Sequence, residues 1–263
     1  MKMHAAEYIT ALHKNGYVSF KLDGRHVFSS EWAAPAIREA LAKPTLYEWA
    51  ESQHPHETFQ GRGIAYGVAL PSGTTELAAT PVVVRRSRHG GMFRFITREY
   101  FLAPTRAPLE LEISLRLRSS GVPTPEVIAI AIYPYAVFWA KSDVMTSRLP
   151  VGADFPAAWQ SADSSTREIM LRETVKLLHA MAKAGAQHPD LNVKNIYLAG
   201  NGPETKAYLL DVDRVIFSGG NDVTRLNFKR LVRSINKWRR RWGFDFSAED
   251  LMLLEHMTLE DKG

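Results

Sequence analysis

The feature that most constrains this chain is a polar loop sequence followed by a short hairpin pattern. Residues 188–195 read His-Pro-Asp-Leu-Asn-Val-Lys-Asn, which places Asp190 and Asn195 five positions apart. An apolar run, a Gly-Asn-Gly turn at 200–202 and a second short strand then lead to Asp211. This order predicts a loop, two short antiparallel strands, and a second carboxylate where the return strand ends. We expect the three polar side chains to converge.

These residue types, in this order, suit transfer of the terminal phosphate of ATP. In kinases of this pattern the first Asp accepts the proton of the attacking hydroxyl, and the Asn and second Asp hold metal ions. Asp190 is therefore the predicted catalytic carboxylate. Asn195 and Asp211 are the predicted ligands of Mg²⁺, which prefers hard oxygen donors. The predicted cofactors are ATP and Mg²⁺, and His188 is expected to support the loop backbone.

Asp213 and Arg214 follow Asp211 closely, and two interpretations of Asp213 remain open. Asp213 either supplies a further carboxylate to the metal or substrate, or it forms a salt bridge with Arg214 or another Arg.

Candidate nucleotide contacts lie further upstream. The candidate phosphate cover consists of Gly61, Arg62 and Gly63. Glycines let backbone N–H groups approach an anion, although Gly-x-Gly is also a common turn. Arg85 ends an apolar strand pattern, where a kinase places the Lys that contacts the α- and β-phosphates; Arg also binds phosphate. Glu110, on the next predicted helix, is either the partner of Arg85 or a solvated helix charge.

Composition limits the class of protein. The 263 residues include no Cys, which excludes disulfides and thiolate-bound metal and fits a reducing compartment. The N-terminus is too polar for a secretion signal. The longest apolar run, 127–140, is shorter than the ~20 residues that span a bilayer and contains Pro134. We expect strands at 127–132, 136–139 and 144–147 instead of a membrane span.

The remaining pattern predicts an α+β chain with two lobes. The first lobe is expected to hold an antiparallel sheet with one long helix, at 110–118, and the second lobe to be mainly helical. Ser165 and Glu168 have the spacing of a helix capping box. The predicted division is an N-terminal extension at 1–58, an N-lobe at 59–147 and a C-lobe at 148–263.

The net charge of +5 is concentrated in two segments. Residues 85–98 include five Arg, and 225–242 include eight basic residues, with no acidic residue in either. This predicts anionic partners at particular faces. Zinc-finger spacing and RNP-like aromatic patterns are absent from the sequence, so nucleic acid is not expected as a partner. The apolar side of 225–242 either lies on an anionic membrane or packs in the core, and we favour the core.

Four segments together resemble the 3-deoxy-D-manno-octulosonic acid (Kdo) kinases of the lipopolysaccharide core kinase family, which also holds heptose kinases. These segments are 85–91, 121–125, 188–196 and 210–214. The resemblance runs from about Phe59 to Trp242. It implies a protein-kinase-like two-lobed fold and ATP-dependent phosphorylation of a Kdo hydroxyl on a lipid A precursor.

The same resemblance implies where the chain works and what it meets. The implied location is cytoplasmic, peripheral on the inner face of the cell inner membrane, with an anionic glycolipid as substrate. Arg85 takes the place of the strand Lys, and Asp190 that of the catalytic carboxylate. The chain departs from the family pattern at Pro189 and Val212.

Two other functions stay open on the sequence. The first is a kinase of the same fold that acts on heptose, another small molecule or a protein. The second is a non-catalytic pseudokinase, suggested by the missing strand Lys and by Asp213 where protein kinases carry Gly.

Overall fold

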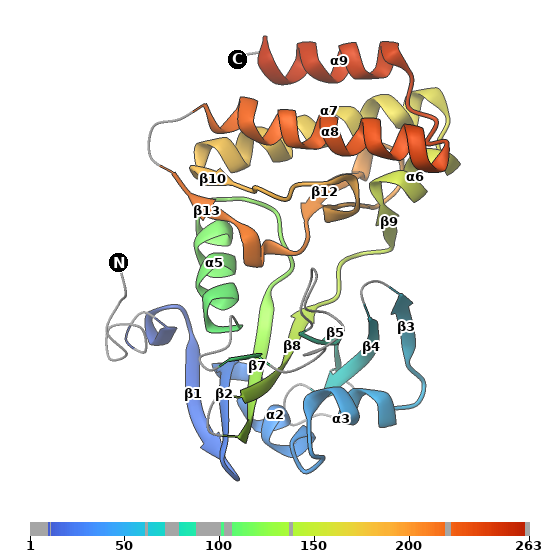
Figure 1. Ribbon diagram of the computed structural model, residues 1–263. Coiled ribbons are helices and arrows are strands. Elements are labelled where there is room, and N and C mark those ends of the chain that lie inside the picture. Colours follow the sequence, from blue (N-terminus) through green and yellow to red (C-terminus); the bar gives the residue numbers. More distant parts are fainter. Residues whose placement is uncertain are drawn as a thin grey trace. The chain divides into compact units, whose positions relative to one another are not determined.

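The computed structural model describes residues 10, 12–60, 63–71, 79–87, 101–102, 107–136, 139–218 and 222–260 (Figure 1). The chain divides into two compact units. The first comprises Met1–Leu111 and Glu126–Arg148, and the second comprises Glu112–Pro125 and Leu149–Gly263. Helix α5 (Ala107–Ser119) begins in the first unit and ends in the second. The predicted α+β class is confirmed, with an antiparallel sheet in the first unit and mostly helices in the second.

The first unit is built on an eight-stranded antiparallel sheet. Its strand order is β1 (Tyr17–Leu22), β2 (Arg25–Ser30), β7 (Val127–Ala136), β8 (Trp139–Ser147), β5 (Ala79–Arg86), β4 (Ile64–Pro71) and β3 (Glu57–Gln60), and β6 (Phe101–Leu102) pairs with β8. Two strands of the predicted N-terminal extension, β1 and β2, belong to this same sheet. They form a hairpin in which Tyr17 faces Ser30.

Residues 127–147 form two strands, whereas the sequence predicted three. β7 runs through Pro134, which pairs with Ala140, and β8 continues from Trp139 to Ser147. The ladder is irregular between Pro134 and Ala136. A proline has no N–H to donate, so a register shift lets the strand continue past it.

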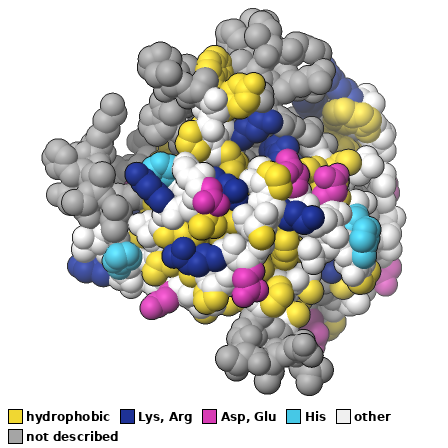
Figure 2. Space-filling model, turned by 90° about the horizontal axis from the view of Figure 1, so that it is seen from below, with side chains coloured by type: hydrophobic (Ala, Val, Ile, Leu, Met, Phe, Trp, Pro, Cys, Tyr) yellow, Lys and Arg dark blue, Asp and Glu magenta, His cyan; other side chains and the backbone are white. Residues whose placement is uncertain are grey.

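One face of the sheet is covered by short helices, α2 (Ala34–Ala40) and α3 (Leu46–Ser52). Their apolar side chains share a core with alternate residues of the strands. In β5, Val82 and Val84 are fully buried in this core, so Arg85 lies on the opposite face of the sheet. Figure 2 shows one face of the molecule, on which basic, acidic and apolar side chains are interspersed. A patch of one charge sign is therefore not found among the side chains coloured on that face.

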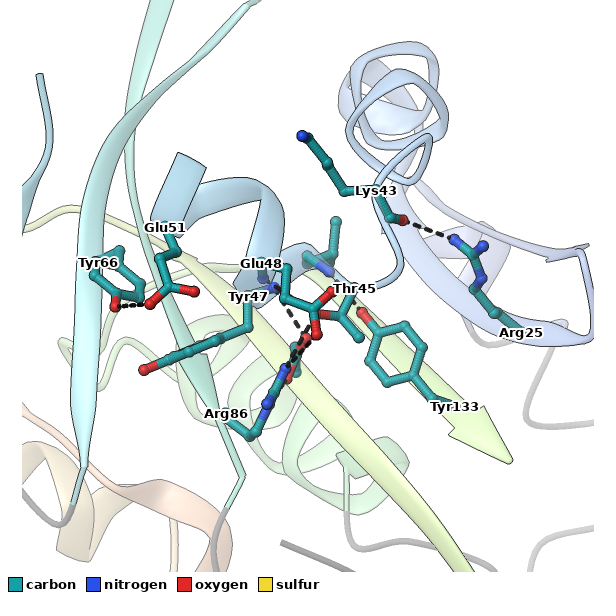
Figure 3. Close-up of polar contacts among 11 residues, drawn as sticks. Arg25, Lys43, Thr45, Tyr47, Glu48, Glu51, Tyr66, Arg86 and Tyr133 are labelled. Carbon is teal, nitrogen blue, oxygen red and sulfur yellow. Dashed lines mark hydrogen bonds and ion pairs between the residues drawn. The ribbon is translucent and has the colours of Figure 1, made fainter. Parts of the chain in front are cut away.

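The start of α3 is held by side chains from distant strands (Figure 3). The N–H of Leu46 donates to the Tyr133 hydroxyl at 2.8 Å, and the N–H of Tyr47 donates to a carboxylate oxygen of Asp143 at 3.0 Å. Asp143, on β8, is fully buried, and it also accepts from the Nε–H of Arg86 at 3.2 Å. Helix N-termini leave N–H groups without helical partners. Asp143 and Tyr133 supply partners here and fasten α3 to the sheet beside Arg86.

The second unit is mainly helical, as predicted. Its helices are α6 (Phe155–Ser161), α7 (Ser164–Lys183), α8 (Val223–Trp242) and α9 (Ala248–Leu259). Helices α7, α8 and α9 lie side by side (Figure 1). Two small sheets complete the unit: β9 (Gly152–Asp154), β11 (Ile196–Ala199) and β12 (Lys206–Leu209) in one, and β10 (Ala186–Gln187) with β13 (Ile216–Phe217) in the other. The predicted hairpin is β11–β12, and its register pairs Ile196 with Leu209.

Helix α7 starts earlier than the capping-box pattern predicted. Its N-cap is Asp163, whose carboxylate accepts from the Thr166 N–H at 2.8 Å. The box expected at Ser165 and Glu168 is therefore wrong. Asp163 is an equally good cap residue that stands two positions earlier, and an aspartate at this end also opposes the positive end of the helix dipole.

Membrane insertion through a helix has no support in the described residues. Each helix among them is too short or too polar to span a bilayer.

Candidate active site

The loop that carries Asp190 is fastened to helix α8. The buried Asn227 side chain accepts from the His188 N–H at 2.9 Å and donates to the Ala186 carbonyl at 2.9 Å. Two helical turns further along, the Ser234 hydroxyl accepts from the Val193 N–H at 3.1 Å. Both ends of the loop are thus held by one rigid helix.

His188 joins the loop to the end of the hairpin. The imidazole is fully buried. Its Nδ1 accepts from the Asp190 N–H at 3.2 Å, and its Nε2 lies 3.2 Å from the carbonyl oxygen of Asp211. These two partners assign the hydrogen to Nε2. Burial holds the pKa of His188 below its ordinary value of 6.5, so the ring is neutral at pH 7. These contacts give His188 the role expected from the sequence, which is to support the backbone of the loop.

Asn195 meets the same imidazole. Its side-chain nitrogen lies 3.3 Å from His188 Nε2, and its Oδ1 accepts from the Asn192 Nδ2 at 2.8 Å. Its carbonyl accepts from the Leu210 N–H at 2.7 Å, one residue before Asp211. Asn195 is buried, with 5% of its surface exposed. The loop and the hairpin therefore bring the Asn195 side chain and the Asp211 carbonyl to one ring, and the convergence of the Asp211 carboxylate with them stays a prediction.

Asp211 has a left-handed backbone, with φ 56° and ψ 54°. Non-glycine residues avoid this region, at a cost of about 1 kcal/mol or more. Asp tolerates it better than most residues do, because its short polar side chain bonds locally. The conformation turns the chain sharply at the end of β12. Strain of this kind concentrates at functional sites.

The donor set around Asp211 suits Mg²⁺ bound together with a phosphate ligand. Among the described residues, no group of three His, Cys, Asp or Glu side chains could hold a metal alone. Mg²⁺ commonly takes one or two protein oxygens and completes its shell with water and substrate phosphates. Asn195 and Asp211 fit that arrangement.

Asp190 lies at the solvent side of the loop, with 53% of its side chain exposed. It accepts a hydrogen bond from Arg230 Nη2 of α8 at 3.1 Å. The loop lysine, Lys194, is paired with Asp154 of the adjoining sheet. Arg230 is therefore the cation that contacts the predicted catalytic carboxylate among the described residues.

Arg85 and Glu110 form an ion pair in the first unit, as the sequence suggested. Glu110 is buried, with 6% of its surface exposed, so the solvated-charge interpretation is wrong. Arg85 keeps 35% of its side chain exposed. Gly63 precedes β4 and is half-buried. Gly61 and Arg62 lie outside the described residues.

Sequence reasoning missed the polar residues by which α8 holds the loop. Asn227, Arg230 and Ser234 stand at positions i, i+3 and i+7, so they share one side of the helix. The sequence did show these three polar residues next to the apolar stripe of α8. Their meaning depends on a partner segment about forty residues away.

The apolar stripe of α8 packs in the core, as favoured over the membrane. Phe228, Leu231 and Ile235 are buried in the core of the second unit. The cations Lys229, Arg233, Lys237 and Arg241 recur every four residues on the exposed side. Trp242 remains 54% exposed at the helix end.

Comparisons with known proteins identify what the whole chain is similar to. The sequence profile of the lipopolysaccharide kinase (Kdo/WaaP) family matches residues 48–254. A 3-deoxy-D-manno-octulosonic acid kinase of Vibrio cholerae is 26% identical over 212 residues, covering 78% of this chain and 88% of that protein. One of Vibrio vulnificus is 27% identical over 235 residues, covering 88% and 92%. A solved structure of WaaP in complex with acyl carrier protein is 14% identical, covers 85% of this chain and 86% of that chain, and has a TM-score of 0.49.

Proposed function

Because this chain belongs to the lipopolysaccharide kinase (Kdo/WaaP) family, we propose that it transfers the γ-phosphate of ATP to a Kdo hydroxyl on a lipopolysaccharide precursor. The chain is a kinase by its family. The Kdo acceptor is supported by relatives named as Kdo kinases that align over most of both chains. The observation that carries the chemistry is the convergence of Asn195 and Asp211 on His188, whose other nitrogen holds the backbone of Asp190.

Asp190 has the exposure and the support that a proton acceptor needs. Its backbone is held by His188, while its carboxylate reaches solvent, where an acceptor hydroxyl can approach. We assign to Asp190 the orientation of that hydroxyl and the acceptance of its proton. Asn195 and Asp211 would hold Mg²⁺, which supplies positive charge against the phosphate oxygens.

The first unit supplies the nucleotide contacts in this proposal. Glu110 pairs with the Arg85 guanidinium, to which we assign contact with phosphate oxygens. Gly61, Arg62 and Gly63 cover the phosphates. The proposed fold is protein-kinase-like, with 59–147 as the nucleotide-binding lobe, 148–263 as the catalytic lobe, and 1–58 as an extension that supports the sheet.

The proposed location is the inner face of the cell inner membrane, as a peripheral protein. The cations of α8 support it, since polybasic surfaces bind anionic headgroups with about 1 kcal/mol for each Lys or Arg. The apolar side of α8 is used in the core and takes no part in this contact.

The test is phosphate transfer from ATP to three acceptors: a Kdo-lipid A precursor, a heptosylated core and a generic protein. We expect Mg²⁺-dependent product with the first acceptor. Asp190→Asn should lower kcat by about 10²–10⁴-fold with the fold retained, because this side chain is half-exposed. Transfer to heptose or protein alone would refute the Kdo acceptor. No transfer to any acceptor would favour the pseudokinase.

A further inference from the structure

Arg230 occupies a position that the proposed chemistry leaves without a purpose. It lies on the loop-facing side of α8, between Asn227 and Ser234, both of which fix the helix to the loop backbone. Its guanidinium touches the carboxylate to which a substrate hydroxyl must come. A guanidinium bound there competes with that hydroxyl for Asp190. We therefore expect the Arg230–Asp190 contact to have a role in the reaction or in substrate specificity.

The Arg230–Asp190 pair is weak and incomplete. Arg230 donates one hydrogen bond from Nη2, at 3.1 Å, although a guanidinium has five N–H donors and prefers two parallel bonds to a carboxylate. Its Nε–H is buried and has no hydrogen-bond partner among the described residues. The two side chains are 35% and 53% exposed. Exposed ion pairs of this kind shift an equilibrium by less than about fivefold, so a better-matched anion can displace Asp190.

We propose that Arg230 is a specificity-determining residue that binds the carboxylate of an acidic sugar acceptor beside Asp190. This inference rests on the proposed function, in which the acceptor is a sugar acid. When the acceptor arrives, the guanidinium turns its free donors to the acceptor carboxylate, and Asp190 becomes available to the hydroxyl.

Electrostatics gives the same cation a second effect. An acidic acceptor must place its carboxylate near that of Asp190. Two such charges about 6 Å apart, in surroundings of intermediate polarity, repel each other, and this repulsion would lower the affinity for the acceptor roughly a hundredfold. Arg230 lies at Asp190 and offsets this repulsion, while Lys194 is already engaged by Asp154. A neutral sugar has no carboxylate to compensate and gains nothing from Arg230. The residue therefore favours acidic over neutral acceptors.

The experiment compares a Kdo-lipid A precursor, dispersed in detergent, with the same molecule whose sugar acid has been converted to an amide. Kinetic constants are measured for the wild type, Arg230→Met and Arg230→Lys. The control variant is Arg225→Met, which removes a cation of the same helix that pairs with Asp222.

We expect the wild type to lose about 10–100-fold in kcat/KM on going from acid to amide, mostly through the acceptor KM. Arg230→Met should reduce this preference to within about threefold, and Arg230→Lys should keep part of it. The KM for ATP should stay unchanged in both variants. Arg225→Met should prefer the acid as strongly as the wild type does.

Three results would overturn the inference. If Arg230→Met keeps the full preference for the acid, Arg230 merely positions Asp190. If the wild type uses acid and amide equally, the carboxylate is not recognised, yet Kdo phosphorylation itself stands. If the wild type phosphorylates only a neutral sugar or a protein, the proposed function fails, and the inference fails with it.

Discussion

Removing the Asp143 carboxylate should selectively loosen the sheet of the first unit. Asp143 is fully buried, and its partner Arg86 has a side chain that is only 12% exposed. Breaking a buried pair by deleting one partner costs about 3–5 kcal/mol, because the other charge stays desolvated. Arg86 keeps Thr45 at 3.0 Å and Glu48 at 3.9 Å. We therefore place Asp143→Ala at the lower end, about 3 kcal/mol.

Native-state hydrogen exchange measures this loss where it occurs. Amides of the β5–β8 ladder should exchange about 100-fold faster in Asp143→Ala, since 1.4 kcal/mol corresponds to a factor of ten. Amides of the β11–β12 ladder in the second unit serve as the internal control and should keep their rates. A single thermal midpoint would average the two units and hide the difference.

The double variant Asp143→Ala/Arg86→Met separates charge from packing. It removes the stranded guanidinium and should recover about 2 kcal/mol, leaving the cost of the unpaired Tyr47 N–H at the start of α3. A loss below about 1 kcal/mol in the single variant would refute this reasoning. So would a double variant that is no more stable than the single one.

The pH dependence of the same site follows from burial. Desolvation raises the pKa of Asp143 above its ordinary value of 3.8, with Arg86 acting in the opposite direction. The native chain then holds this proton at pH values where the unfolded chain has released it. Asp143 thus contributes most to the free energy of unfolding below pH 3.8, and less as the pH rises through the native pKa. The stability advantage of the wild type over Asp143→Asn should shrink over that window; an advantage that grows with pH would contradict the sign.

Three further changes test other parts of the structure. Glu110→Gln should raise the KM for ATP about tenfold or more, because the Arg85 guanidinium loses its buried partner. The control Glu112→Gln, at an exposed position of α5, should leave this KM unchanged. Equal effects of the two variants would contradict the role of the Arg85–Glu110 pair. Changing Lys229, Arg233 and Lys237 to Glu should weaken binding to anionic vesicles by about 100-fold. The control changes three exposed cations elsewhere to Glu and should leave vesicle binding almost unchanged: Lys21, Lys183 and Lys206. Similar losses of binding in both triple variants would show that only the net charge of the protein matters. Gly152→Ala should separate β9 from β11, because the new Cβ would lie 2.0 Å from the Leu198 carbonyl oxygen; a melting temperature equal to that of the wild type would contradict this contact.

Local patterns in the sequence were sufficient for the elements of the site. The loop, the turn and the hairpin followed one another within 25 residues, so residue spacing alone predicted that Asn195 and Asp211 would meet. The register of β11 and β12 confirms the hairpin and brings the backbones at its open end together. The Arg85–Glu110 pair was also accessible, because each residue stood at a recognisable position in a strand or a helix.

Longer-range choices were not accessible from the sequence. Asp163 and Ser165 both suit a helix start, and the sequence pattern does not decide between them, whereas in the structure the Asp163 carboxylate caps α7. Pro134 suggested a strand end, but a register shift accommodates it. The contacts of Arg230 with Asp190 and of Asp143 with Arg86 join segments about 40 and 57 residues apart, and no local pattern records such pairs.

Helix α8 turns Asn227 and Ser234 to the loop and leaves Lys229 and Arg233 exposed, so its rotational phase is a constraint in its own right. Each residue advances an α-helix by about 100°. One inserted residue between Asn227 and Ser234 would swing every later side chain by that angle and withdraw the hydroxyl from the Val193 N–H. Point changes on the outer side leave this phase intact. The number of residues that separates Asn227 from Ser234 is therefore fixed by the loop that both side chains contact.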